Sequence, residues 1–206
     1  MLFGIFLIAF AVVSNSPLSA SMESFNTLEN YAVTIRSSGD GSTEAIKYFY
    51  KKPGFIRMEF IEPHKGAVLI YNPYTKRVKL RPFGFFKSFV MDLSPDDSLI
   101  KSSKGHRIDK SDIGTLLKNA RMLGEDGDIK ALRKEVVGGK SARVVSVRGR
   151  GKTVGGVGSL LLWIDEKSHL PLKVASYAPD GKLIEEVLME DLRINQAFPA
   201  DFFSIG

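Results

Sequence analysis

Two glycine–lysine segments are the first residues in the chain whose types and spacing could do chemistry. Gly138–Ser141 and Gly151–Thr153 both end in the Gly-Lys-Ser/Thr sequence of a phosphate-binding loop. That loop also needs a glycine five residues before its Gly-Lys pair, so that backbone N–H groups surround the phosphates, and it joins a strand to a helix. The chain has Lys134 and Ser146 at those positions and strand-like sequence on both sides. The sequence therefore argues against nucleotide binding.

The three histidines could act as metal ligands or general bases only if the fold gathered them. His64, His106 and His169 lie far apart, and none has the short His or Cys spacing of a zinc site. His64 follows Pro63, and His169 stands just before Leu170-Pro171, which is typical of turns. We therefore expect structural or solvated histidines, no metal and no cofactor.

The chain carries no local catalytic signature. It contains no cysteine and no Gly-x-Ser-x-Gly nucleophile elbow. Its carboxylate pairs, Asp96-Asp97, Glu125-Asp126 and Glu185-Glu186, are adjacent in sequence, and adjacent side chains of a strand point to opposite faces. The sequence predicts that the protein is not an enzyme. The alternative, a hydrolase, would need a serine, a histidine and a carboxylate that meet in space from distant parts of the chain.

A basic and aromatic segment, Tyr48–Lys52, has the composition of a site where single-stranded nucleic acid stacks on aromatic rings beside cations. The same residues fit a strand with Tyr48 and Tyr50 facing inward and a charged end. The net charge of +6 suits anionic surfaces such as lipid headgroups, and it is also common in soluble proteins. We expect no nucleic-acid partner, and contact with a membrane surface stays open.

Strand-like runs dominate the first half of the chain. Glu44–Phe60, Gly66–Pro73 and Arg77–Pro82 are rich in β-branched and aromatic residues and are ended by Pro, Gly or Asn, as in successive antiparallel strands. Ile56, Met58 and Phe60 would share one face of a strand, whereas residues 68–71 are apolar on both faces. A sheet with this much apolar surface must cover an apolar interior.

Part of this region resembles a known family. Lys51–Phe60 reads Lys-Lys-Pro-Gly-Phe-Ile-Arg-Met-Glu-Phe, and Leu69–Pro73 reads Leu-Ile-Tyr-Asn-Pro. Together they resemble the Lys-Arg-Pro and Tyr-Asn-Pro core of periplasmic lipoprotein carriers of the LolA/LolB type. Where the carriers have Arg immediately before that proline, this chain has Lys52.

A second resemblance lies near the C-terminus. Leu162–Val174, Pro179–Lys182 and Phe198–Phe203 are similar to the closing strands of the wider outer-membrane lipoprotein-sorting superfamily. The two matches span roughly residues 23–205. They imply an open, curved half-barrel with helices in its concave side and an acyl-chain cavity between sheet and helices.

The remaining patterns describe one α+β domain. A short helix over 21–30 precedes strands over 31–35 and 44–51, with a turn at Gly39–Gly41. Ser94–Ser98 has the composition of a helix start, and Ser111 or Asp109 would cap a helix with one apolar face. Strands follow over 129–137, 142–148, 160–164, 172–177 and 183–192, and the glycine-rich segment 149–158 is expected to be a mobile loop.

The N-terminus has the outline of an export signal. Leu2–Val13 is apolar, no charge precedes Glu23, and Pro17–Ala20 offers a small residue for cleavage, although the usual basic n-region is missing. The alternative is an uncleaved anchor, for which the run is short, because a membrane-spanning helix needs about 20 residues. We therefore expect residues 1–20 to be a signal peptide, residues 21–206 to be the binding domain, and the location to be the periplasm.

The phenylalanine cluster Phe83–Phe89 is the strongest functional candidate. It could be ordinary core, or it could line or close an acyl-chain cavity, because the sheet has more apolar wall than two helices would cover. The expected function is a carrier of lipid or lipoprotein acyl chains toward the outer membrane; the alternative is an envelope sensor or scaffold that binds a protein partner at an open sheet edge. The predicted lining residues are Met58, Phe60, Leu69, Tyr71, Phe83, Phe85, Phe86, Phe89 and Trp163.

Overall fold

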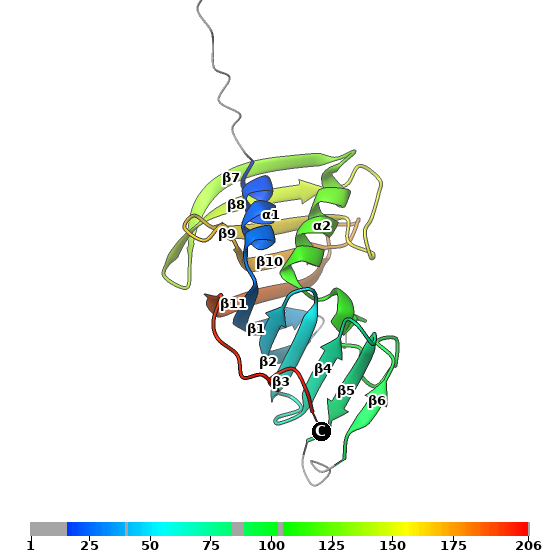
Figure 1. The fold of residues 1–206 in the computed structure, drawn as a ribbon. Coiled ribbons are helices and arrows are strands. Elements are labelled where there is room, and N and C mark those ends of the chain that lie inside the picture. The colour runs from blue at the N-terminus through cyan, green and yellow to red at the C-terminus, as the bar shows by residue number, and fades with distance from the viewer. Residues whose placement is uncertain (1–15, 40, 84–88, 103–104, 206) are drawn as a thin grey trace, which may run out of the picture.

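Eleven strands form one antiparallel sheet in the order β6-β5-β4-β3-β2-β1-β11-β10-β9-β8-β7 (Figure 1). The computed structural model describes residues 16–39, 41–83, 89–102 and 105–205. The strands of the first half are β1 (Asn30–Gly39), β2 (Ser42–Lys51), β3 (Phe55–Glu62), β4 (Val68–Asn72), β5 (Arg77–Arg81) and β6 (Met91–Leu93). Those of the second half are β7 (Asp128–Val137), β8 (Lys140–Arg148), β9 (Ser159–Asp165), β10 (Pro171–Tyr177) and β11 (Leu183–Ile194).

The first and last strands join the two halves in the middle of the sheet. β1 pairs with β2 on one side and with β11 on the other, and Ile35 lies opposite Met189 across that central seam. Each half is otherwise a meander of neighbouring strands, which is the connection that short turns permit.

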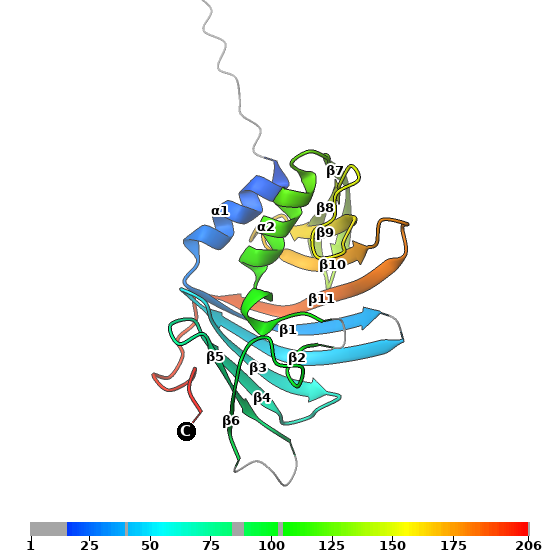
Figure 2. The ribbon, with the colours of Figure 1, turned by 90° about the vertical axis from the view of Figure 1, so that its right-hand side faces the viewer.

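Two helices cover the concave side of the curved sheet, α1 (Pro17–Thr27) and α2 (Ile113–Gly124) (Figure 2). Both pack on the second half, with α2 against β8 and α1 against β8 and β9. A side-chain oxygen starts each helix: Ser16 accepts from the N–H of Ser19, and Asp112 accepts from that of Thr115. The predicted α+β half-barrel with helices in its concave side is confirmed.

Three predicted local features were wrong. The first helix begins at Pro17 and not at Ser21, and the cap of the second is Asp112. The segment that begins at Ser94 forms turns, because Ile100 is the one aliphatic residue buried between positions 94 and 102, and so little burial does not offset the nucleation cost of a short helix. A 3-10 turn over Ile108–Lys110 leads into α2 instead.

The concave face of the first half carries apolar side chains in three rows that cross the strands. One row runs through Tyr31, Tyr50, Ile56, Tyr71 and Val78. The next runs through Val33, Tyr48, Met58, Leu69 and Leu80, and the third through Ile35, Ile46 and Phe60. Because side chains alternate between the two faces of a strand, the residues of one row lie next to each other on the concave face. They therefore contact the same part of the interior.

A missing side chain allows the two helices to cross. A Cβ atom at Gly114 would lie 2.2 Å from a ring carbon of Phe25. We expect Gly114→Ala to destabilise the protein by about 1–3 kcal/mol, the usual cost of overpacking. Urea unfolding measures this, with Arg121→Ala on the exposed side of α2 as the control. Equal stability of the two variants would show that the crossing is loose.

Three stacked tyrosines tie the start of α2 to the sheet. The Tyr31 ring lies 5.9 Å from that of Tyr48 and 5.2 Å from that of Tyr50. The Tyr31 hydroxyl accepts from the N–H of Ile113 at 3.1 Å, and the Tyr48 hydroxyl is 3.0 Å from Ser111 Oγ. Burial raises the pKa of all three phenols, that of Tyr50 to about 12.

These raised pKa values predict a loss of stability in alkali. The unfolded chain releases the phenol protons near pH 10, whereas the folded chain keeps them, so the stabilisation is complete below pH 10 and is lost as pH rises through about 12. Urea unfolding at pH 9, 10 and 11 should show falling stability, and ultraviolet titration of the folded protein should show these tyrosines still protonated at pH 11. Ionisation of every tyrosine in the folded state by pH 11 would contradict this.

Candidate binding cavity

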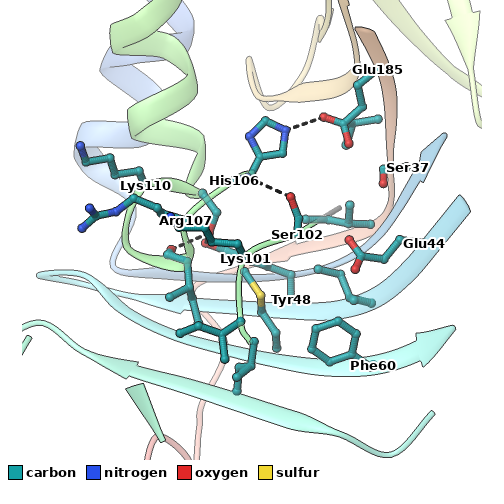
Figure 3. Close-up of a pocket in the computed structure, with 18 of the residues that line it drawn as sticks. Ser37, Glu44, Tyr48, Phe60, Lys101, Ser102, His106, Arg107, Lys110 and Glu185 are labelled. Atoms are coloured by element: carbon teal, nitrogen blue, oxygen red, sulfur yellow. Dashed lines mark hydrogen bonds and ion pairs between the residues drawn. The ribbon is translucent and has the colours of Figure 1, made fainter. Parts of the chain in front are cut away.

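A cavity of about 530 Å³ lies between the concave face of the sheet and the crossing segment, which consists here of Leu99–Ser102 and Gly105–Asp112 and precedes α2 (Figure 3). Its walls are mainly apolar. β1 to β5 supply Ile35, Ile46, Tyr48, Met58, Phe60, Leu69 and Leu80; the crossing segment and α2 supply Ile100, Ile108 and Leu116; and the second half supplies Val154, Val157, Leu160, Val174, Val187 and Met189. The size is that of sites that enclose small ligands.

Four of the predicted lining residues lie in the cavity wall: Met58, Phe60, Leu69 and Phe83. Tyr71 belongs to the row nearer the helices and does not line it. Phe85 and Phe86 fall outside the described residues. Phe89 is 58% exposed and is absent from the described cavity wall.

Trp163 lies on the opposite face of the sheet, which corrects its prediction as a lining residue. Its Nε1 donates to Glu135 at 2.6 Å, and Lys173 Nζ lies 4.8 Å from the ring centre. The neighbours Leu162 and Ile164 belong to the helix-facing core, whereas Trp163 belongs to a separate cluster. Strand alternation explains this, because β9 is apolar on both faces and composition alone does not choose between them.

The prediction missed the walls that β1, β10, β11 and the crossing segment provide. Alternation in β2 could have found Ile46 and Tyr48, which share a face and lie opposite Phe60 and Met58. The central pairing of β1 with β11 places Val187 and Met189 in the cavity wall, and no local sequence pattern predicts a pairing between strands so far apart in the chain.

Polar contacts hold the crossing segment over the cavity. His106 Nε2 lies 2.9 Å from Glu185 of β11, and the His106 N–H donates to Ser102 Oγ, as Figure 3 shows. Arg107 donates to both carboxylate oxygens of Asp109, at 2.9 and 2.8 Å, and also pairs with Asp96. Ser102, His106 and Glu185 thus form a polar part of the cavity lining, here called the rim, and Glu44 and Lys110 add further charges to the lining.

Among the described residues, Ser102 and His106 do not form the nucleophile–base pair of a hydrolase. Ser102 Oγ contacts the backbone of His106, and the imidazole contacts Glu185. A nucleophile and base would require the hydroxyl to meet the imidazole nitrogen. Elsewhere, His64 stacks on Phe83 with ring centres 5.3 Å apart, and His169 is in a turn with a φ of 56°. In the described part of the chain, no three His, Asp or Glu residues gather as a metal site.

A second hollow of about 680 Å³, here called the groove, lies between α1, α2 and the turns after β2 and β4. Those turns carry the two sequence motifs, and Pro53, Gly54, Tyr71 and Pro73 all line the groove. The other lining residues are Met22, Phe25, Asn26, Tyr50, Ile56, Asp109, Asp112, Gly114, Thr115, Leu117, Lys118, Arg121, Met122 and Glu125. Next to it, Lys52 Nζ donates to the carbonyl of Asn26 at 2.7 Å and holds the end of α1.

The predicted glycine-rich turns also have a structural role. Gly138 and Gly139 form the hairpin turn between β7 and β8 with positive φ angles, so neither glycine–lysine segment joins a strand to a helix. Within the described residues, no helix is long and apolar enough to cross a membrane.

One family model matches the chain: the MucB/RseB N-terminal domain, over residues 93–204, just over half of the sequence. No curated protein matches in sequence. The match begins at the last residue of β6 and covers the crossing segment, α2 and the whole second half of the sheet.

Solved structures share the fold. A conserved protein of uncharacterised function from Thermus thermophilus has a TM-score of 0.57 at 10% identity, with 92% of each chain covered. MucB in the Pseudomonas aeruginosa MucA/MucB complex has a TM-score of 0.56 at 16% identity, with 90% of this chain and 61% of that chain covered. The Mycobacterium tuberculosis lipoprotein LppX has a TM-score of 0.53 at 11% identity, with 90% and 96% covered. The chain thus spans about three fifths of the MucB chain.

Proposed function

Because the chain belongs to the MucB/RseB N-terminal domain family, we propose that it is an exported, periplasmic binding protein that holds an acyl chain of a lipid or lipoprotein in the cavity and carries it toward the outer membrane. The observation that carries this proposal is the apolar cavity of about 530 Å³ between the sheet and the crossing segment. A sheet that needed only to fold would close such a space with its own side chains.

The energetics permit binding without covalent chemistry. Burial of about 14 methylenes gains on the order of 10 kcal/mol at about 0.8 kcal/mol each. Association and ordering oppose this by several kcal/mol. The remainder corresponds to micromolar or tighter binding.

The wall and the rim suit the two ends of an amphiphile. Met58 and Leu69 are buried apolar residues whose side chains offer no hydrogen bond, so the inner part accepts a hydrocarbon. The rim carries the His106–Glu185 pair and the hydroxyl of Ser102, which would face a polar headgroup or water. This distribution fits a binding protein better than an enzyme.

Purification of the exported protein from cells without detergent, followed by native mass spectrometry, tests the proposal. We expect a bound lipid or lipoprotein chain that organic solvent extracts, and a delipidated protein that binds a dansyl-labelled fatty acid. Rejection of every amphiphile by the folded, delipidated protein would rule the proposal out.

The second candidate function is an interaction module of the envelope. It is favoured by the MucA/MucB complex among the similar folds and by β7, a strand of ten residues at the end of the sheet with exposed Ile129 and Val136. An edge of this kind can pair with a strand of another protein. A photo-crosslinker at Val136 should then capture a protein in cells, whereas one at Tyr74, which is 74% exposed and lies outside the cavity, should not.

The assignment of residues 1–20 to a signal peptide remains part of the proposal. Helix α1 begins at Pro17, and Leu18 is buried in the core, so a cut after Ala20 would remove one buried contact. The intact mass of the exported protein decides where the leader ends.

A further inference from the structure

The outer face of β2 to β5, here called the basic face, carries cations in three rows that cross the strands. In one row, Arg57 of β3 lies between Phe49 of β2 and Ile70 of β4. Their neighbours in sequence Tyr48 and Met58 line the cavity, so this row points away from it. The two adjacent outward rows lie two residues away on each side. The cations of the three rows are Lys47, Lys51, Arg57, Arg77, Lys79 and Arg81.

Two carboxylates within these rows neutralise only some of the cations. Glu59 Oε1 lies 2.7 Å from Arg57 Nε. Asp92 of β6 lies opposite Lys79 and pairs with both Arg77, at 2.7 Å, and Lys79, at 2.8 Å. These pairs hold their partners in place on the sheet and leave the remaining cations of the basic face without a matching charge.

The remaining cations of the face are Lys47, Lys51 and Arg81, and none of them forms an ion pair with a described residue. Lys47 and Lys51 are exposed, and Arg81 is half-buried. Two further exposed carboxylates border the face, Glu62 at the end of β3 and Asp201 on the C-terminal tail. The cations outnumber all of these carboxylates, so the basic face keeps a net positive charge.

Apolar side chains of the same face lie beneath the charged ones. Val68 and Ile70 of β4 point outward, yet they are only 4% and 2% exposed, and both helices lie on the other side of the sheet. Lysine and arginine cover such neighbours with their methylenes and keep their charged ends in water. The charged ends therefore form the outermost layer of the basic face.

An exposed aromatic ring stands at the edge of the basic face. Tyr74, in the turn between β4 and β5, is 74% exposed, and its ring lies 5.5 Å from that of half-buried Phe55. Its N–H donates to Asn72 Oδ1 at 2.9 Å, and exposed Lys76 follows in the same turn. The turn thus holds a phenol ring beside cations, a combination that is typical of the boundary between lipid headgroups and water.

We propose that the basic face docks on a bilayer surface that contains anionic lipid. Lys47, Lys51 and Arg81 face the lipid phosphates, and Tyr74 enters the headgroup layer. A bilayer is the occupant because the cations are spread over an open face and none of them lines the cavity or the groove, so they match an extended anionic surface better than a small anion. The docking face lies opposite the cavity and stands whether or not the cavity holds an acyl chain.

Cosedimentation of the exported protein with vesicles tests the docking face. Vesicles of phosphatidylcholine are compared with vesicles of phosphatidylcholine and phosphatidylglycerol in equal amounts. Each cation near an anionic surface raises affinity about five-fold, so we expect binding to the anionic vesicles to be at least about ten-fold tighter and to be lost at high salt. Any contribution of the apolar N-terminus is the same for both vesicles.

A charge reversal locates the contact. Lys51→Glu should weaken binding to the anionic vesicles about ten-fold or more. Lys130→Glu is the matched control, because it makes the same change at an exposed lysine of β7, at the other end of the sheet, and should leave binding within about two-fold of the wild type.

A tryptophan in the turn reports entry into the headgroup layer. The chain has one tryptophan, Trp163, which is 8% exposed, so its emission should not change when vesicles are added. The emission of Tyr74→Trp should move to shorter wavelength with the anionic vesicles, because the added indole leaves water.

Several results would overturn the proposal. Equal affinity for the two vesicles is one, and equal losses in Lys51→Glu and Lys130→Glu are another, because net charge alone would then drive binding. An unchanged emission of vesicle-bound Tyr74→Trp would exclude this face as the contact. Val187→Trp in the cavity wall should bind the vesicles as the wild type does, and a loss there would place the contact at the cavity. Failure of the folded protein to bind either vesicle would leave an acidic protein as the partner of the face.

Discussion

Replacement of Val187 by Trp should abolish most acyl-chain binding while the protein stays folded. Val187 lies on β11 near the central seam, and its half-buried side chain lines the cavity. An indole there would displace about four methylenes of a bound chain, which removes roughly 3 kcal/mol at about 0.8 kcal/mol each. That loss corresponds to roughly a 100-fold rise in Kd for a dansyl-labelled fatty acid.

The control makes the same substitution outside the cavity. Val136 on β7 is 75% exposed, so Val136→Trp should bind the fatty acid as the wild type does. Urea unfolding of both variants verifies that they remain folded, because a collapsed sheet would also lose binding. If folded Val187→Trp keeps wild-type affinity, the acyl chain does not occupy this cavity.

The sequence predicted the sheet because its strands are short, apolar and separated by turn residues. The hairpin over β7 and β8 and the strands β9 to β11 lie within a few residues of their predicted bounds. In contrast, the turn at Ser94 has the residues of a helix start without the apolar stripe that would hold a helix on the sheet. Local signals decide where an element begins, and packing decides whether it forms.

The sequence predicts cavity-lining residues only where apolar and polar side chains alternate along a strand. Met58 and Phe60 alternate with charged residues, so their face was evident, whereas Trp163 lies in a strand without alternation and was placed on the wrong face. The row through Tyr50, Ile56 and Tyr71 shows the further limit. These residues share the concave face with Met58, but the start of α2 separates them from the cavity. Where α2 packs is a property of the tertiary structure, so no pattern in the strands predicts this separation.

The two motifs behind the family resemblance lie beside each other, which their distance in sequence did not reveal. A Cβ atom on Gly54 would lie 3.5 Å from Pro73, so the two turns pack together at the mouth of the groove. Lys52 then occupies the position where the carriers have Arg and donates to the last turn of α1. The proline turns of the motifs therefore position a helix against the sheet, whereas Met58, Phe60 and Leu69 in the strand parts of the same motifs line the cavity.

The second large effect is expected at the C-terminal tail, where Phe202→Ala should destabilise the protein by about 3 kcal/mol. The Phe202 ring lies 4.7 Å from that of Phe198 and 4.9 Å from that of Phe49 on the outer face of β2. Arg57 of β3 contacts both the ring, at 4.8 Å, and the carbonyl oxygen, at 2.9 Å. Removal of the ring leaves Phe49 and the arginine stem without their cover.

A double-mutant cycle with Arg57→Leu separates the ring contact from simple burial. Leucine keeps much of the arginine stem but loses the charge, so the interaction energy between the two changes reports the cation–π contact, expected at about 0.5–1 kcal/mol at this partly exposed site. Phe203→Ala is the comparison variant. Its ring lies 5.2 Å from that of Phe202 and contacts Phe198 and Phe55, but it meets no arginine among the described residues, so its coupling to Arg57 should be smaller than that of Phe202. If Phe202→Ala costs less than about 0.5 kcal/mol, the tail is not held on the sheet by its aromatic rings, and the stability of the half-barrel resides in the concave core alone.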